Sequence, residues 1–177
     1  VDVAKMKAEF LQQYYDKNGI PFRARLIANF SRQMKLVSKF PGLFNWFYSV
    51  DLFRKIAHTL VGFHPERSMP KLAKQTLLNW FRKRNVDAAT SKRKLYFFCD
   101  EFTNYNDVEI GKKGILLLEA LGYEVIIPKH IESGRTYLSK GLVKKAAGIA
   151  NQNIQLLADL VMKEAPLIGI EPSAILT

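Results

Sequence analysis

The sequence predicts an α/β protein in two parts: a basic, all-helical unit over residues 1–92 and a small three-layer α/β unit over residues 93–177. In the first part, apolar residues recur at helical spacing between Pro and Gly breaks. In the second, three short apolar runs alternate with helical patterns, which predicts a parallel sheet with the order strand, helix, strand, helix, strand. At 177 residues and 48% hydrophobic content, the chain can enclose a core.

The first part reads as a series of helices. One apolar pattern over residues 3–18 ends at an Asn-Gly pair, and a second over residues 22–34 ends before Pro41-Gly42. Residues 43–61 fit one or two short helices, and residues 77–84 fit one more. The stretch from Asn85 to Lys94 is predicted to be a linker, so the boundary between the two units falls there.

Aromatic residues are concentrated in the middle of the helical part, directly before Arg54 and Lys55. They are Phe40, Phe44, Trp46, Phe47, Tyr48 and Phe53. Burial in a helical core is the favoured interpretation. The alternative is an interfacial helix, since aromatic rings beside basic residues suit the surface of a membrane.

The second part changes its hydrophobic period. Strands are predicted at residues 95–99, 123–127 and 166–170. The first is a short, continuous apolar run typical of a strand covered on both faces, and Pro128 and Glu171-Pro172 end the other two. A helix capped by Asp107 and a longer helix from Ser139 to Met162 separate them. Ligands of parallel sheets bind beyond the carboxyl ends of the strands. The loops at residues 100–106, 129–137 and 171–173 are therefore the candidate functional loops.

The charge is distributed unevenly between the two parts. Residues 1–94 hold 19 of the 27 Lys and Arg residues but 6 of the 16 Asp and Glu residues, which gives +13 there and −2 in the remainder. A solvated basic surface is the first interpretation, followed by a face for anionic lipid or for an acidic partner domain. Nucleic acid ranks last, since the predicted strands lack the aromatic and basic pattern of an RNA-binding sheet.

Composition excludes several classes of protein. A single cysteine excludes a disulfide scaffold and any metal cluster held by several thiolates of this chain. No apolar run approaches the roughly 18 residues that would span a bilayer. We therefore expect a cytoplasmic location, with peripheral attachment to the membrane as a further option.

The loop at residues 130–136, which reads His-Ile-Glu-Ser-Gly-Arg-Thr, carries the most chemistry. Ser133, Gly134 and Arg135 before a helix suit an anion. His130 and Glu132, together with Glu101, are weak candidates for metal ligands, because their types and spacing are unspecific. No G-x-S-x-G elbow supports a hydrolase, and we expect no catalytic residue. Polar loop residues that cap a helix remain the favoured interpretation.

Several motifs, in order, resemble the cysteine-cysteine-glycine (CCG) domain. They are residues 98–105 (FCDEFTNY), 121–125 (LGYEV), 132–135 (ESGR), 139–141 (SKG) and 169–173 (GIEPS). This domain occurs in the iron–sulfur subunits of glycolate oxidase, anaerobic glycerol-3-phosphate dehydrogenase and heterodisulfide reductase, and in fused FAD-linked dehydrogenases of the D-lactate type. Residues 1–10 resemble the stretch of the fused type that follows the last cysteine of a two-cluster ferredoxin module. The segment His64-Pro65-Glu66-Arg67 resembles the linker that precedes its CCG domain.

The sequence departs from the family at the cluster ligands. Alignment on residues 102–105 places the first family cysteine at Glu101, and alignment on Gly134 places the Cys pair at Glu132 and Ser133. Cys99 lies two residues early, within the predicted strand. Oxygen donors replace sulfur poorly in an iron–sulfur cluster. The remaining loop residues, Asn104, Gly134, Arg135, Glu171 and Ser173, are a candidate anion site.

The resemblance implies a parent enzyme in which FAD oxidises a 2-hydroxy acid such as D-lactate or glycolate and [4Fe–4S] clusters carry the electrons to a quinone-linked or other acceptor. We expect this chain to be the C-terminal scaffold of such an enzyme, a piece of a longer protein that docks on the upstream flavin and ferredoxin domains, without a cofactor or activity of its own. The alternative is a stand-alone module that binds an anionic metabolite or a metal at residues 132–135.

Overall fold

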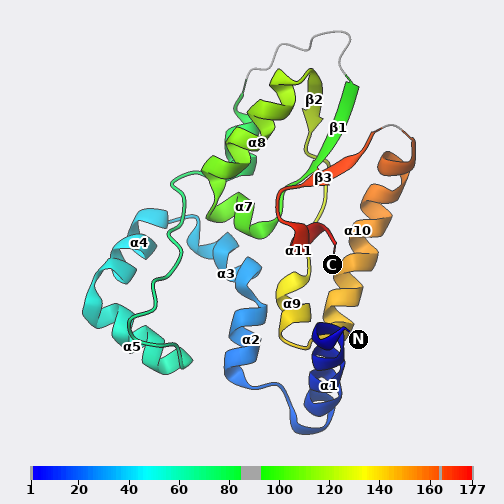
Figure 1. Cartoon of the computed structure of the whole chain (residues 1–177). Helices are drawn as coiled ribbons and strands as arrows, with labels where there is room; N and C mark the ends of the chain where they lie inside the picture. The colour runs from blue at the N-terminus through cyan, green and yellow to red at the C-terminus, as the bar shows by residue number, and fades with distance from the viewer. Residues whose placement is uncertain (1, 85–92, 164, 177) are drawn as a thin grey trace.

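The computed structural model describes residues 2–84, 93–163 and 165–176. A three-stranded parallel sheet lies between helices, and further helices of the N-terminal half extend from one end of it (Figure 1). This arrangement confirms the predicted fold class, a small α/β unit preceded by helices. No helix of the described ranges is long and apolar enough to cross a membrane.

The helical half contains six helices within residues 2–84. They are α1 (Val3–Asn18), α2 (Phe22–Ala28), α3 (Phe30–Val37), α4 (Pro41–Ser49), α5 (Asp51–Val61) and α6 (Leu77–Arg82). The side chain of Asp2 accepts hydrogen bonds from two backbone N–H groups and caps α1, which ends before Gly19 at a φ of 80°. Pro41 opens α4, where its missing N–H costs nothing.

The α/β half follows the predicted order with additional short helices. Its elements are β1 (Arg93–Phe98), α7 (Glu101–Tyr105), α8 (Val108–Ala120), β2 (Tyr123–Ile126), α9 (Arg135–Ser139), α10 (Val143–Lys163), β3 (Leu167–Gly169) and α11 (Pro172–Ile175). The three strands lie within two residues of their predicted bounds.

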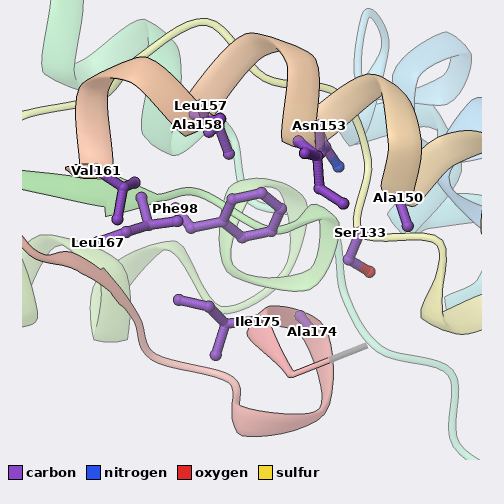
Figure 2. Close-up of a pocket in the computed structure, with 11 residues that line it drawn as sticks. Phe98, Ser133, Ala150, Asn153, Leu157, Ala158, Val161, Leu167, Ala174 and Ile175 are labelled. Atoms are coloured by element: carbon purple, nitrogen blue, oxygen red, sulfur yellow. The ribbon is translucent and has the colours of Figure 1, made fainter.

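The sheet has the order β2-β1-β3, so the first strand of the sequence is the central one. Leu95 pairs with Val125 of β2, and Phe97 pairs with Ile168 of β3. Leu95 and Phe97 belong to a core that includes Ile115 of α8 and Leu77 of α6. Phe98 points to the opposite face, toward α10 (Figure 2). Helices therefore cover both faces of β1, as its apolar run predicts.

The two halves pack on each other through buried residues. Leu77 of the helical half is fully buried in the core of the α/β half. The hydroxyl of Thr136 donates to the carbonyl of Ala28 at 2.9 Å, and the hydroxyl of Tyr137 donates to Asn29 Oδ1 at 3.1 Å. The predicted linker lies largely outside the described residues, which resume at residue 93.

Three helix predictions need correction. The pattern at residues 22–34 forms two helices, because Asn29 donates its side-chain N–H to the Arg25 carbonyl and the Ala28 carbonyl bonds to Thr136. The helix expected from Ser139 begins at Val143, since Gly141 at a φ of 74° separates it from α9. Short helices, α7 and α11, also form within two of the expected loops.

The favoured interpretation of the aromatic segment, burial in a helical core, is wrong for this chain. Helix α4 has no buried residue, and Phe40, Trp46 and Phe47 are exposed. Helices α4 and α5 pack mainly on each other and form a hairpin that projects from the molecule (Figure 1). Leu52, Ile56 and Leu60 continue the exposed apolar surface along α5.

The apolar stripe of α1 also faces outward. Val3, Met6, Phe10 and Tyr14, which define its helical period, are between 49% and 73% exposed. The helix packs on α9 and α10 through its opposite face, where Ala8 and Gln12 are buried. Gln12 accepts a hydrogen bond from the backbone of Lys144 at 3.1 Å. The most apolar face of α1 is therefore not covered by any described part of this chain.

Candidate functional site

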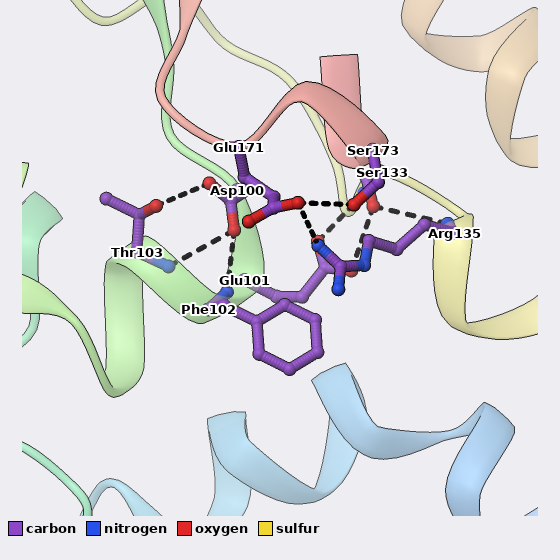
Figure 3. A network of polar contacts seen from close by, with 8 residues as sticks. All are labelled: Asp100, Glu101, Phe102, Thr103, Ser133, Arg135, Glu171 and Ser173. Atoms are coloured by element: carbon purple, nitrogen blue, oxygen red, sulfur yellow. Dashed lines mark hydrogen bonds and ion pairs between the residues drawn. The ribbon is translucent and has the colours of Figure 1, made fainter. Parts of the chain in front are cut away.

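The candidate site lies at the carboxyl ends of the strands, where the three predicted loops converge (Figure 3). Asp100 directly follows β1 and is buried. Its carboxylate accepts hydrogen bonds from the backbone of Phe102 at 2.9 Å and of Thr103 at 3.1 Å, and from the Thr103 hydroxyl. This N-cap forms α7 in what the sequence predicts as a loop, and it fixes the position of Glu101.

Glu101 and Ser133 bond to each other at the centre of this site. Both side chains are 4% exposed. The Glu101 carboxylate accepts the backbone N–H of Ser133 at 3.0 Å and the Ser133 hydroxyl at 2.9 Å. The hydroxyl in turn accepts the backbone N–H of Arg135 at 3.2 Å. The two residues are 32 apart in sequence, and the parallel sheet brings them together.

Arg135 is held within the chain on two sides. Its guanidinium lies 3.0 Å from the Glu171 carboxylate, which also accepts the hydroxyl of Ser173. On its other side the guanidinium lies 4.4 Å from the centre of the Phe102 ring, which stacks on Phe30 of α3. The positive charge of Arg135, which the sequence suggested as an anion ligand, is therefore neutralised by Glu171. Gly134, the N-cap of α9, adopts a φ of 85° in this loop.

Glu132 turns away from the pair formed by Glu101 and Ser133. Its carboxyl reaches Ser31 of α3 and the charge of Arg32, while Oε2 has no hydrogen-bond partner among the described residues. Burial is the main cause that raises the pKa of Glu132, and the nearby charge of Glu101 raises it further. The position that aligns with one family cysteine thus contacts the helical half.

His130 has both ring nitrogens engaged. Nε2 accepts the backbone N–H of Cys99 at 3.2 Å, so Nδ1 carries the proton and donates to the Ile131 carbonyl at 2.8 Å. Burial lowers the pKa of His130, which favours this neutral form. The ring also stacks on Phe98 at 4.4 Å between centres. Across the described ranges, no group of three His, Cys, Asp or Glu side chains is placed to hold a metal ion.

The donor set at this site does not fit an iron–sulfur cluster. Such clusters take thiolate ligands, and the three positions where the resemblance to the CCG domain implies cysteines carry two carboxylates and a hydroxyl. Glu101 and Ser133 already satisfy each other's hydrogen bonds. Cys99 is buried in the core beside β1, and burial, followed by the charge of Asp100, raises the pKa of its thiol. A protonated, buried thiol is a poor metal ligand.

An apolar pocket of about 320 Å³ lies beside Ser133, between α10 and α11 (Figure 2). Phe98 enters it from β1, and Leu157 and Val161 of α10 form one wall. The side-chain amide of Asn153 also lines the pocket, but it is hydrogen-bonded to the backbone of Ile131 and Glu132 in the loop before α9. The surface that the pocket offers to a ligand is therefore mainly apolar.

The structure brings most of the predicted site residues together. Glu101, Ser133, Arg135, Glu171 and Ser173 form one network (Figure 3). Asn104 does not join this network. Its Oδ1 accepts a hydrogen bond from the backbone N–H of Leu78 at 3.1 Å and so anchors α6.

Two residues of the site, Asp100 and Phe102, were not predicted from the sequence. Asp is a preferred N-cap residue, and its position after an apolar run is the sequence signal for Asp100. No local pattern identifies the ring of Phe102 as the platform for Arg135.

The known proteins that are similar to this chain are dehydrogenases or a dehydrogenase subunit. The chain is 24% identical over 184 residues to D-2-hydroxyglutarate dehydrogenase of Escherichia coli K12 and 22% identical over 185 residues to that of Haemophilus influenzae. It is 25% identical over 157 residues to one subunit of the anaerobic glycerol-3-phosphate dehydrogenase of E. coli K12.

These matches cover nearly all of this chain but only a small part of each relative. They include 99%, 100% and 88% of this chain, but 18% of each D-2-hydroxyglutarate dehydrogenase and 40% of the glycerol-3-phosphate dehydrogenase polypeptide. The chain thus spans less than a fifth of the length of the first relatives. No family model matches it, and no solved structure matches it significantly.

Proposed function

We propose that this chain is a scaffold and docking portion of a larger oxidoreductase that acts on a 2-hydroxy acid, and that it holds no iron–sulfur cluster itself. The relatives named D-2-hydroxyglutarate dehydrogenase support the substrate class, and they match along 99% or more of the chain. The resemblance to the CCG domain supplies the expected parent: FAD removes hydride from the substrate, and [4Fe–4S] clusters carry the electrons to a quinone-linked or other acceptor.

The observation that carries the proposal is the closed pair of Glu101 and Ser133. A site that binds a substrate or a metal has hydrogen-bond donors or acceptors free for it. The buried Glu101 carboxylate and Ser133 hydroxyl instead form hydrogen bonds with each other. Arg135 and Glu171 neutralise one another in the same way. The convergent loops therefore join β1, α9 and α11 into a rigid support, and we assign no catalytic residue to this chain.

Two exposed apolar surfaces support docking. We define the docking faces as the outer side of α1 (Val3, Met6, Phe10, Tyr14) and of the α4–α5 hairpin (Phe40, Leu43, Trp46, Leu52, Ile56, Leu60), all at least 49% exposed. Exposed apolar area of this extent is typical of interaction surfaces. The proposed partners are the upstream flavin and ferredoxin domains for α1, and those domains or the membrane surface for the hairpin.

Metal analysis of the chain tests the absence of a cluster. We expect no stoichiometric iron or acid-labile sulfide after anaerobic reconstitution of the wild type. The triple variant Glu101→Cys, Glu132→Cys and Ser133→Cys gives the matched comparison, since it restores thiols at the three aligned positions. A reconstituted cluster in the wild-type chain itself would refute this part of the proposal.

Dye reduction by the full-length protein tests the activity. D-2-hydroxyglutarate, D-lactate and glycolate are the substrates to compare, and we expect turnover of at least one. We also expect that Phe10→Ser with Met6→Ser weakens electron transfer or assembly and leaves the Tm of this chain unchanged. Leu117→Ser on α8, which changes an exposed apolar residue outside both docking faces, is the control. Full activity in the α1 variant would contradict docking through α1, and no turnover of any 2-hydroxy acid would contradict the substrate class.

A further inference from the structure

A second hollow, of about 410 Å³, lies between α1, α2 and the end of α9. Figure 1 shows these three helices below the sheet in that view. Three cationic side chains line it: Lys7 of α1, Arg23 of α2 and Lys140 directly after α9. Leu11 and Ile27 add apolar surface. The segments that form this hollow come from both halves of the chain, so tertiary packing creates it.

A fourth cation lies close to the same hollow. The guanidinium carbons of Arg23 and Arg67 lie 5.4 and 5.3 Å from the centre of the Phe63 ring, so one aromatic side chain holds both arginines near each other. After burial, the charges of Lys7, Arg23 and Arg67 are the causes that lower the pKa of Lys140. Lys140 therefore lies within electrostatic range of the other three cations.

Within the part of the chain that the structure describes, none of these four cations forms an ion pair within 4.0 Å, although six other Lys and Arg side chains do. Asp16, an acid on the same helix as Lys7, is engaged by Lys144 at 2.7 Å. A concave cluster of unpaired cations concentrates positive potential and attracts anions.

We propose that this hollow is a binding site for a phosphate-bearing anion. A compact phosphate group carries up to two negative charges and several acceptor oxygens, which suits two arginines and two lysines. Tyr15 and Ser139 also line the hollow. The concave shape favours a small anion or a lipid headgroup over the flat surface of a macromolecule. This inference goes beyond the proposed function and does not depend on it.

Binding measurements with the full chain test the site. Inorganic phosphate and pyrophosphate are titrated calorimetrically, and sedimentation is compared between phosphatidylcholine vesicles and vesicles that also contain phosphatidic acid. We expect saturable binding that weakens with salt. Arg23→Gln is expected to weaken it by roughly tenfold or more, because a charge-assisted hydrogen bond is lost. Arg25→Gln, an equal charge change on the same helix outside the hollow, is expected to retain wild-type affinity.

Lys140→Gln separates a loss of binding from a loss of folding. It removes a charge that lies within electrostatic range of three other cations, so we expect a Tm equal to or above that of the wild type together with weaker binding. Binding of the free phosphates identifies a soluble ligand, whereas binding of the phosphatidic acid vesicles alone identifies a headgroup; both support the site if Arg23→Gln weakens them. The proposal is overturned if neither probe binds, if Arg25→Gln weakens binding as much as Arg23→Gln, or if only a nucleic-acid oligomer binds.

Discussion

Replacing Ser133 by alanine is the sharpest test of how the strand-end loops are held together. The hydroxyl donates to Glu101 at 2.9 Å and accepts the backbone N–H of Arg135 at 3.2 Å, and both Ser133 and Glu101 are 4% exposed. Ser133→Ala leaves the buried carboxylate with the backbone N–H of residue 133 as its donor and without the hydroxyl. Losing a hydrogen bond to a buried charge costs about 1.5–3 kcal/mol, and the orphaned N–H adds to it. We expect a loss of about 3 kcal/mol in the free energy of unfolding.

Thermal and urea denaturation followed by circular dichroism measure this loss. For a chain of this length about 3 kcal/mol corresponds to a Tm lower by roughly 6–12 °C. Ser49→Ala is the control: it also removes a hydroxyl that donates a hydrogen bond, but the residue is exposed and the acceptor is the backbone carbonyl of Trp46, so we expect a change within about 0.5 kcal/mol.

A double-mutant cycle decides whether the two groups act as a pair. Glu101→Ala combined with Ser133→Ala removes the carboxylate along with its donor, so the double variant is expected to be more stable than the sum of the single losses predicts. A Ser133→Ala variant within about 0.5 kcal/mol of the wild type, or strictly additive losses, would refute the reasoning.

Three further predictions concern the loops and glycines. Gly141→Ala is expected to destabilise the chain by more than about 2 kcal/mol, because φ is 74° there and a Cβ would lie 2.2 Å from Leu11 Cβ, whereas Gly148→Ala, in open space within α10, is expected to be neutral or stabilising in the same denaturation assay. Glu132→Gln is expected to raise the free energy of unfolding at pH 7. The folded-state pKa of Glu132 lies above its ordinary value of 4.5, so its ionisation penalty grows as the pH rises from there, and the two proteins should be equally stable at lower pH. Burial lowers the pKa of His130 below 6.5, so this residue costs stability as the pH falls below 6.5; His130→Gln should remove that dependence, and an unchanged pH profile would contradict the neutral, doubly bonded ring.

Local patterns were sufficient for the strands of the α/β half. Residues 95–98 of β1 are consecutive apolar residues and are all buried, so the local sequence already indicates a strand covered on both faces. Because parallel strands end at one edge of a sheet, the chemistry of the loops could be placed there as well. The sequence alone thus placed Glu101 and Ser133 at one edge, although they are 32 residues apart.

In the helical half, local patterns predicted the helices but not which of their faces are buried or where they break. The period of Val3, Met6, Phe10 and Tyr14 correctly indicates a helix, but the buried face of α1 is the one with Ala8 and Gln12. The break at Asn29 depends in part on Thr136, which bonds to Ala28 from 108 residues away. The four cations around the second hollow likewise come from separate segments.

The sequence by itself determined the alternation of three strands with helices in the second half and the approximate positions of those strands. It also carries oxygen donors where the resemblance to the CCG domain implies cysteines. Only the tertiary structure decided that Glu101 binds Ser133, that Glu171 neutralises Arg135, and that the apolar faces of α1 and of the α4–α5 hairpin lie outside the core. The physical reason is that periodicity and residue type are local properties. Whether a polar group is satisfied or an apolar face is covered depends on what distant segments bring to it.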